Sequence, residues 1–464
     1  MAEDHLGQRT QSLLARGQPF LKGGSRYEAV AAASQGQGFL PPRQLIVDRA
    51  EGDFIWDLEG QRFIDFQNGW ATNPLGNCHP EILGAVQAAQ KRYGFHWEHP
   101  LRIPLAERLA NLSPGQALPR FSFEVSGTEA VEAAVHAALC HTDRRYIIAF
   151  ASSFHGEGLG TKLISAYDAQ NYVGLEAWSG GVIRAPFPHS EAIPPGLSLA
   201  QYQDYCLWYL EHHIPQYVMA ADNIAAVLIE PALAEGGNWV PEPDFLKGIR
   251  AICDRQDWLM IADEVLTGVG RTGTLWAVEH ADVIPDIMVV GKHLSGGIEP
   301  FAGFSARDDI LGDNPRATSG STFAGTPAGC AAALKTLEII ERDDVLTQAR
   351  HLSELAAAAC ADWSERFEIV SEVRGLGLLI GVSFQGSRAN GVHVARSVRD
   401  EMLKRGVWAL CDFQPQVRLY PALNMAPEVL LQGLSAMAEA IETVDRKGPT
   451  VGDYPARPSG NVGF

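Results

Sequence analysis

The sequence lacks the features that tie a chain to an oxidising compartment or to a membrane. Its seven cysteines are odd in number and scattered, and no two of them form a C-x-x-C pair. This argues against a disulfide framework and against a zinc site. No apolar run reaches the roughly 18 residues that span a bilayer, and the N-terminus shows no basic-then-apolar signal. We therefore expect a cytoplasmic protein with no metal and no membrane partner.

Positive charge is also scarce. The chain has 37 Lys and Arg against 55 Asp and Glu, a formal net charge of −18. This balance argues against nucleic acid or an anionic membrane as a partner, and it favours cationic small molecules. An acidic surface that only aids solubility is the alternative. A length of 464 residues is enough for a large core and for two domains.

Strand and helix patterns alternate along the chain. Continuous apolar runs are typical of strands covered on both faces of a parallel sheet. Such runs occur at residues 259–262 and 287–290, and further strands are predicted at 121–125, 145–150 and 224–229. With helical stretches between them, they predict an α/β fold with a doubly wound, mostly parallel sheet. Residues 160–220 are predicted to be an insertion with a helix near 200–218, and short strands and helices after residue 341 predict a second, smaller domain.

Two of these runs end in groups suited to one chemistry. Asp263 follows the run 259–262, and Lys292 follows the run 287–290 after a glycine. Ligands bind beyond the carboxyl ends of strands in such a sheet, so both side chains should face one crevice. Pyridoxal phosphate (PLP) needs a lysine for a Schiff base and a carboxylate for its pyridinium nitrogen. A surface lysine and an acidic loop remain the alternative on these residues alone.

A strand, a tight turn and an alanine-rich helix follow one another at residues 121–141. The turn reads Ser126-Gly127-Thr128-Glu129. The first turn of a helix has free N–H groups, which bind phosphate well. An ordinary serine cap is the alternative.

Two other motifs suggest ligands that we discount. The glycines of residues 268–273 match a dinucleotide fingerprint, but residues 263–265 separate them from the strand. We interpret them as a tight loop. Glu211, His212 and His213 are helical neighbours that point apart, so a surface position is favoured over a metal site.

In chain order, the motifs resemble those of the class III (ω-) aminotransferases, PLP enzymes of fold type I, over about residues 45 to 430. The motifs that carry the resemblance are Ser126–Ala134, Phe154–Gly156, Ile229–Gly237, Asp263–Gly273, Asp286–Gly297, Gly320–Gly325, Arg374–Gly381 and Val417–Pro421. The resemblance implies a large domain at 69–340 and a smaller α+β domain made from the chain termini, residues 1–68 and 341–464.

The resemblance also implies roles around the cofactor ring. Lys292 carries PLP as a Schiff base and then moves the substrate proton, and Asp263 keeps the pyridine nitrogen protonated. Phe154 and Val265 cover the two faces of the ring. His155 and Glu230 are further residues of the cofactor site.

The phosphate is implied to bind in the turn at Ser126, Gly127 and Thr128. Thr322 is implied to reach it from the second subunit. The site would then be completed across a two-fold interface, so the resemblance predicts a homodimer.

The substrate residues are implied less directly. Arg418 matches an arginine that clamps the carboxylate of a keto acid such as 2-oxoglutarate or pyruvate. Glu230 is taken as the glutamate that pairs with it when the substrate has no carboxylate. Glu157 stands where related enzymes often have arginine, which favours a polyamine or an amino sugar as the amine substrate. Trp70 and Trp97 line the substrate entrance or belong to the core.

The motifs leave other activities open. A PLP-dependent racemase, epimerase or aminomutase would keep the same Lys292 and Asp263. A protein that binds ligands without catalysis is the remaining alternative, and it predicts no bound chromophore.

Overall fold

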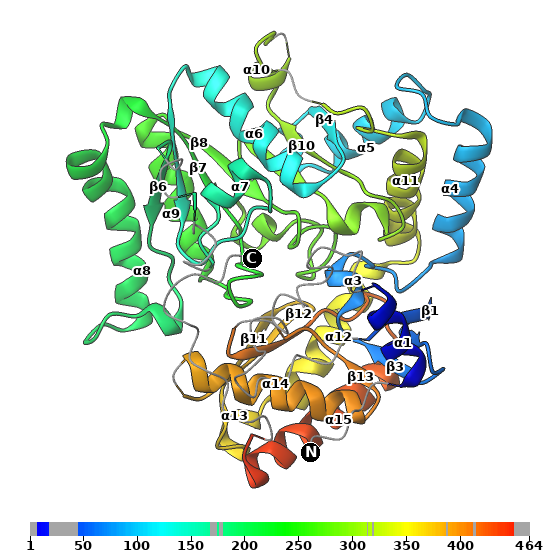
Figure 1. Ribbon diagram of the computed structural model, residues 1–464. Coiled ribbons are helices and arrows are strands. Elements are labelled where there is room, and N and C mark those ends of the chain that lie inside the picture. The colour runs from blue at the N-terminus through cyan, green and yellow to red at the C-terminus, as the bar shows by residue number, and fades with distance from the viewer. Residues whose placement is uncertain are drawn as a thin grey trace.

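Figure 1 shows the computed structural model. The structure describes residues 7–17, 45–167, 174–175, 180–312, 314–317, 320–386, 388–411 and 414–449. Within these ranges the strands form three sheets, of seven, four and three strands. The predicted N-terminal and C-terminal segments therefore lie partly outside the described residues.

The largest sheet has the strand order β4-β10-β9-β8-β7-β5-β6. Its strands are β4 (Arg120–Glu124), β5 (Tyr146–Phe150), β6 (Val182–Ala185), β7 (Ile224–Ile229), β8 (Leu259–Asp263), β9 (Ile287–Val290) and β10 (Ala302–Ala306). β10 is antiparallel to both neighbours, whereas β9, β8, β7, β5 and β6 are parallel. The mostly parallel sheet confirms the predicted α/β fold.

The central strands show why their sequences are continuously apolar. Every residue of β7, β8 and β9 is buried, because helices cover the sheet (Figure 1). β6 lies inside the predicted insertion at 160–220 and forms an edge of the main sheet. The sequence pattern predicted a helix in this stretch and did not predict this strand.

Helices surround this sheet. They are α4 (Pro80–Tyr93), α5 (Arg102–Leu112), α6 (Gly127–Thr142), α7 (Leu159–Ile164), α8 (Leu199–Trp208), α9 (Pro243–Gln256) and α11 (Pro327–Arg342). α8 continues as a π-helix over Tyr209–Val218 instead of the single regular helix predicted for 200–218. Pro215 lies in that part, where it cannot donate to a regular helical ladder.

The two smaller sheets lie together at the bottom of Figure 1. One contains β1 (Val47–Glu51), β2 (Phe54–Asp57), β3 (Arg62–Asp65) and β13 (Val407–Trp408), and the other contains β11 (Val370–Leu376), β12 (Leu379–Phe384) and β14 (Gln416–Leu419). The helices beside them are α12 (Val345–Cys360), α14 (Arg388–Lys404) and α15 (Pro427–Lys447). β3 pairs in parallel with β13, so an N-terminal strand and a C-terminal strand share one sheet. The domain boundaries at 68 and 340 stay predictions.

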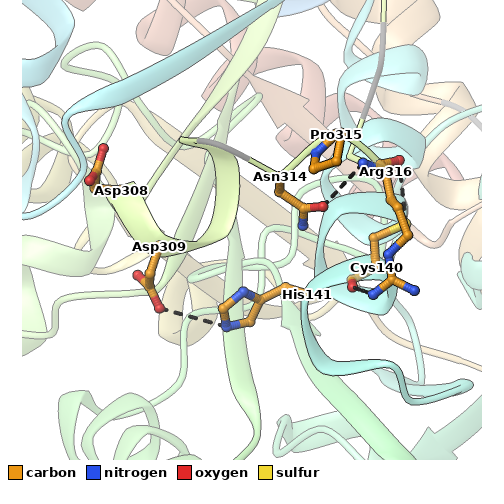
Figure 2. Close-up of a pocket in the computed structure, with 7 residues that line it drawn as sticks. All are labelled: Cys140, His141, Asp308, Asp309, Asn314, Pro315 and Arg316. Atoms are coloured by element: carbon orange, nitrogen blue, oxygen red, sulfur yellow. Dashed lines mark hydrogen bonds and ion pairs between the residues drawn. The ribbon is translucent and has the colours of Figure 1, made fainter.

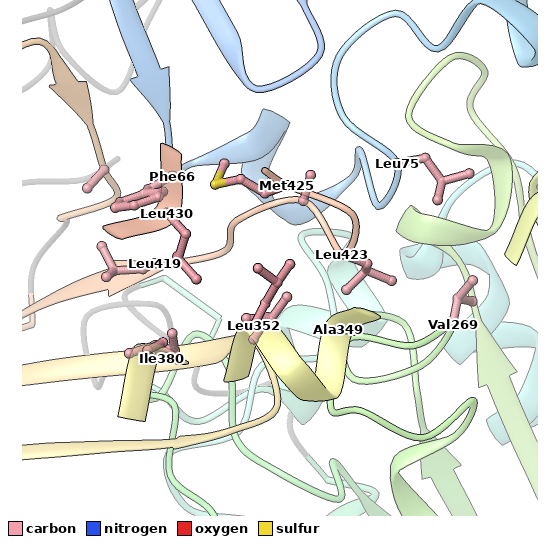
Figure 3. Packing of buried hydrophobic residues seen from close by; sticks show 14 of the residues in the cluster. Phe66, Leu75, Val269, Ala349, Leu352, Ile380, Leu419, Leu423, Met425 and Leu430 are labelled. Carbon is pink, nitrogen blue, oxygen red and sulfur yellow. The ribbon is translucent and has the colours of Figure 1, made fainter. Parts of the chain in front are cut away.

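One buried cluster connects this part to the large sheet. Figure 3 shows Phe66, which directly follows β3, packed in it with Leu352 of α12, Leu419 of β14 and Leu430 of α15, and all four are at most 2% exposed. The same cluster includes Val290, the last residue of β9. The end of β9, from which Lys292 follows, therefore belongs to the core that the large sheet shares with the smaller sheets.

In the described ranges, no helix has the length and apolarity required to cross a bilayer. The same residues contain no cluster of three or more His, Cys, Asp or Glu side chains arranged for a metal ion.

Candidate active site

The predicted catalytic residues stand at the carboxyl ends of adjacent central strands of the large sheet. Asp263 is the last residue of β8 and is paired in register with Val289 of β9. Lys292 follows two residues after the end of β9, and Glu230 follows directly after β7. Because these strands are parallel, all three residues stand at the carboxyl ends of the strands, where Asp263 and Lys292 were predicted to lie.

Lys292 stands in an uncommon backbone conformation. Its φ is +40°, a left-handed value that residues with a side chain rarely adopt. Burial lowers the pKa of its amine, and Arg418 lowers it further, while Glu235, Glu230 and Asp263 act in the opposite direction. A lowered pKa favours the neutral amine that Schiff-base formation requires.

Asp263 is held in one orientation by two donors. Its Oδ2 lies 2.8 Å from Nδ1 of His155, and its Oδ1 accepts from the backbone N–H of Val265 at 3.1 Å. Asp263 and His155 are 4% and 3% exposed. The backbone N–H of His155 in turn donates to Ser165 Oγ at 2.9 Å. A buried carboxylate fixed in this way can hold a ring nitrogen that approaches along the same edge.

Glu230 is buried with both oxygens occupied. They accept from the backbone N–H groups of Phe154, at 2.8 Å, and of Ala234, at 3.2 Å. Burial first, and then the nearby Asp263, raise the pKa of Glu230 to about 8. The raised pKa favours the neutral acid near pH 7.

Arg418 pairs with a different glutamate from the one expected. Its Nη1 lies 2.8 Å from Oε2 of Glu235 and donates to the carbonyl of Ala234 at 3.2 Å. The prediction that Glu230 is its partner was wrong, because backbone N–H groups already occupy the Glu230 carboxyl. The Arg418 side chain is 1% exposed and that of Glu235 is 14% exposed. Glu235 lies in the motif Ile229–Gly237, and the motif alone did not predict this role.

The phosphate turn has the geometry of a capped helix start. Ser126 is the N-cap of α6, and its Oγ accepts from the backbone N–H of Glu129 at 3.2 Å. The helix therefore leaves the N–H groups of Gly127 and Thr128 without an internal partner. A Cβ on Gly127 would lie 2.9 Å from Val265 Cγ1. Only glycine therefore allows the turn to approach Val265 this closely.

The other predicted residues lie around this edge. Phe154 contacts Tyr167 edge-on, with ring centroids 5.3 Å apart. The Glu157 side chain is 46% exposed and lies 3.3 Å from Nζ of Lys162, so its carboxylate already has a cationic partner. Its backbone N–H donates to Thr128 Oγ1.

Trp70 and Trp97 are 37% and 56% exposed. They are surface residues, and the alternative that they belong to the core was wrong. Trp97 Nε1 donates to the carbonyl of Thr322 at 3.0 Å within the same chain. The role of Thr322 toward a second subunit stays a prediction.

Two hollows lie at the opposite end of the sheet, where the parallel strands begin. One, of about 500 Å³, is lined by residues 140–141 at the end of α6 and by residues 308–309 and 314–316. Figure 2 shows Asp309 facing His141 there and Arg316 facing Cys140. The other, of about 420 Å³, opens beside the first residue of β8, Leu259. Neither hollow includes Lys292 or Asp263.

The donor set at the carboxyl edge fits PLP. It offers an amine with a lowered pKa at Lys292, a buried and oriented carboxylate at Asp263, and unused helix N–H groups beside a glycine that admits close approach. Lysine, carboxylate and anion site are the groups that bind this cofactor in proteins.

The chain matches the family model for aminotransferase class-III over residues 38–441. The 5-aminovalerate aminotransferase DavT of Pseudomonas aeruginosa is 33% identical over 421 residues, covering 89% of this chain and 96% of that protein. The 4-aminobutyrate aminotransferase GabT of Escherichia coli is 33% identical over 355 residues, covering 76% and 81%.

Solved structures agree with this match. The ω-transaminase from Pseudomonas jessenii in complex with PMP has a TM-score of 0.83 at 25% identity, covering 90% of this chain and 96% of that one. A PLP-bound amine transaminase from an uncultivated Pseudomonas species has a TM-score of 0.81 at 25% identity, covering 86% and 95%. The chain therefore belongs to the class-III aminotransferases, which are PLP-dependent enzymes.

Proposed function

We propose that this enzyme transfers an amino group from an ω-amine to a keto acid such as 2-oxoglutarate or pyruvate. The observation that carries the proposal is the buried Arg418, paired with Glu235 and close enough to Lys292 to affect the pKa of its amine. Arg418 can bind the carboxylate of one substrate, and Glu235 can replace that carboxylate when the other substrate has none.

When bound, PLP supplies an electron sink for the bonding electrons at the substrate carbon. Lys292 would carry it and would hold or deliver the proton at that carbon, since its lowered pKa makes the neutral amine available. Asp263, oriented by His155, would hold the ring nitrogen. The residues that would hold the phosphate and the ring faces are Ser126, Gly127, Thr128, Phe154 and Val265.

Arg418 has to serve two kinds of substrate. A guanidinium binds a carboxylate through two parallel hydrogen bonds, so a keto acid can displace Glu235. A buried arginine left without a counter-charge is costly, so an amine without a carboxylate is accepted only while Glu235 stays in place. Both states keep the charge of Arg418 balanced.

For the amine we propose a compound with its amino group at a chain end. Relatives of this chain are named as 4-aminobutyrate, 5-aminovalerate and succinylornithine aminotransferases. A polyamine or amino sugar, favoured by Glu157 in the sequence, is the narrower version of the proposal. It requires Glu157 to exchange Lys162 for the substrate ammonium, since the two side chains lie 3.3 Å apart.

We further propose a cytoplasmic homodimer in which Thr322 of each chain completes the phosphate site of the other. Support comes from the exposed position of Trp97, beside Thr322, on the surface. Sedimentation at micromolar concentration tests the dimer.

Half-reactions test the function. PLP-loaded protein is mixed with single donors without an acceptor, and the absorbance of the cofactor is followed with glutamate, alanine, 4-aminobutyrate, diamines and amino sugars. Conversion to the pyridoxamine form identifies the donors. In Arg418→Lys, reaction with 2-oxoglutarate should weaken at least about tenfold more than reaction with a diamine, because one bidentate contact is lost. Equal losses for both would contradict the clamp.

A further inference from the structure

A second arginine lies in line with Arg418 on the small sheet. In the register of β11 and β12, Arg374 is opposite Gly381, and in the register of β12 and β14, Gly381 is opposite Arg418. Directly opposed residues on neighbouring strands present their side chains on the same face. The two arginines therefore stand on one face, about 10 Å apart along the row, with a glycine between them.

The loop Ala234–Trp239, which carries Glu235, lies on this row. A Cβ on Gly381 would be 3.2 Å from Asn238 Cβ and 3.4 Å from the carbonyl oxygen of Gly237. The glycine thus leaves the space in which the loop sits. Arg418 holds one end of the loop through Glu235 and the Ala234 carbonyl.

Arg374 holds the other end. Its Nε and Nη2 both donate to the carbonyl of Gly237, at 2.9 and 2.6 Å, and its guanidinium carbon lies 3.4 Å from the ring centroid of Trp239. Its remaining donors reach Ser383 Oγ and Gln416 Oε1, both at 2.7 Å. The Arg374 side chain is 8% exposed.

Asn238 adds a further fixed contact. Its Nδ2 donates to the carbonyl of Ile380 at 2.8 Å, and its Oδ1 accepts from the hydroxyl of Tyr420 at 3.0 Å. Asn238 is fully buried, and its φ of +52° follows a φ of +137° at Gly237. This part of the loop is pinned in a backbone form that the chain would not adopt unaided.

We propose that Arg374 is a positioning residue that sets substrate specificity by fixing the Glu235 loop, so that Glu235 alone moves when Arg418 takes a carboxylate. Arg374 anchors the loop in both states, whereas Arg418 exchanges its partner. The inference rests on the proposed role of Arg418. Loosening the contact of Arg374 with the loop weakens the Glu235–Arg418 pair. That pair is required only when no substrate carboxylate is bound at Arg418.

The test is equilibrium binding of glutarate, a carboxylate without a reactive carbonyl, to the PLP-loaded enzyme by calorimetry. Arg374→Lys keeps the charge and the aliphatic stem over Trp239 but loses the two-donor fork on Gly237. Glu235, which competes with glutarate for Arg418, is then held less well in the variant. The Kd of glutarate should therefore fall about threefold to tenfold, a change that corresponds to part of the free energy of one charged hydrogen bond. An unchanged or higher Kd would overturn the proposal.

A double variant separates positioning from general damage. Glu235→Gln removes the competing charge and should itself lower the Kd of glutarate. Adding Arg374→Lys to it should change the Kd by less than about twofold, because the residue through which Arg374 acts is already neutral. Effects that multiply would show that Arg374 acts elsewhere. If Arg418→Lys and Glu235→Gln both leave the Kd of glutarate unchanged, the clamp itself fails, whatever Arg374 does.

Two further variants complete the design. Glu372→Gln is the matched control, since the Glu372 carboxylate lies 3.6 Å from Arg374 but accepts from Ser190 Oγ, outside the Glu235 loop. The Kd of glutarate for this variant should match that of the unmodified enzyme. Tyr420→Phe removes only the hydroxyl on Asn238 and should lower the Kd about twofold to threefold. This milder variant decides the question if Arg374→Lys does not fold, since an unchanged Kd would again contradict the anchor.

Discussion

The raised pKa of Glu230 leads to a prediction about stability. Its carboxyl ionises at about 8 in the folded protein, against an ordinary value of 4.5. Between these values the folded protein holds a proton that the unfolded chain has released. Stability must therefore fall as the pH rises through this window, by up to about 1.4 kcal/mol per pH unit for one proton.

Glu230 should account for most of the change in stability between pH 7 and pH 8. Glu264 is also buried and carries a raised pKa, but of about 7, so most of its contribution is complete below that window. Because Glu230 ionises only partly in this range, its titration should lower the free energy of unfolding of the cofactor-free protein by about 1 kcal/mol between pH 7 and pH 8. The variant Glu230→Gln cannot titrate and should not show this loss.

Urea unfolding of cofactor-free protein at pH 7.0 and 8.0, at one fixed protein concentration, measures the difference. The comparison uses only the change with pH, so any constant effect of the amide cancels. Glu264→Gln is the control and should keep the loss between pH 7 and pH 8. Equal pH dependence in the unmodified protein and Glu230→Gln would refute the assignment of a neutral Glu230.

Two more predictions concern the cofactor. Lys292→Ala should abolish turnover while PLP still binds without a covalent bond, as seen in an absorbance spectrum of released cofactor; retained multiple turnover would rule out Lys292 as the essential base. Gly127→Ala should weaken PLP binding about tenfold in a fluorescence titration, because the new Cβ meets Val265 Cγ1 at 2.9 Å. Gly84→Ala, on an open face of α4, is its control and should bind PLP normally.

The central strands were predictable because a strand that is buried on both faces needs an apolar residue at nearly every position. β7, β8 and β9 are apolar at every position except the acid that ends β8, so the residues that follow them could be assigned to one edge. α4 also carries a clear signal, since Ile82, Val86 and Ala89 recur at helical spacing between Pro80 and Tyr93 and are all buried. Proline at the first helical position and an abrupt end at glycine mark both boundaries.

The short strands gave weaker signals. β10 reads Ala-Gly-Phe-Ser-Ala and has no β-branched residue, although all of it is buried. β6 is a short edge strand in a long connection. Their place depends on the strands already present beside them, which is information from tertiary packing and not from local sequence.

The partner of Arg418 depended on the same kind of information. Glu230 and Glu235 stand five residues apart in one motif, and residue type alone does not separate them. The loop does so physically, since it turns through Gly237 and Asn238 at positive φ. Glu230 stays under the backbone of Ala234, while Glu235 is brought to Arg418.

The difference between the two glutamates has a chemical consequence. Near pH 7 a neutral Glu230, with its pKa of about 8, cannot balance the charge of a buried guanidinium. The more accessible Glu235 can do so, and a substrate carboxylate brings the same charge in its place. Exchange at Arg418 then leaves the net charge around Lys292 nearly constant, so the lowered pKa of its amine should be similar with either substrate. An enzyme that alternates between a carboxylate and a carboxylate-free partner needs this constancy, because the same lysine moves the proton in both half-reactions.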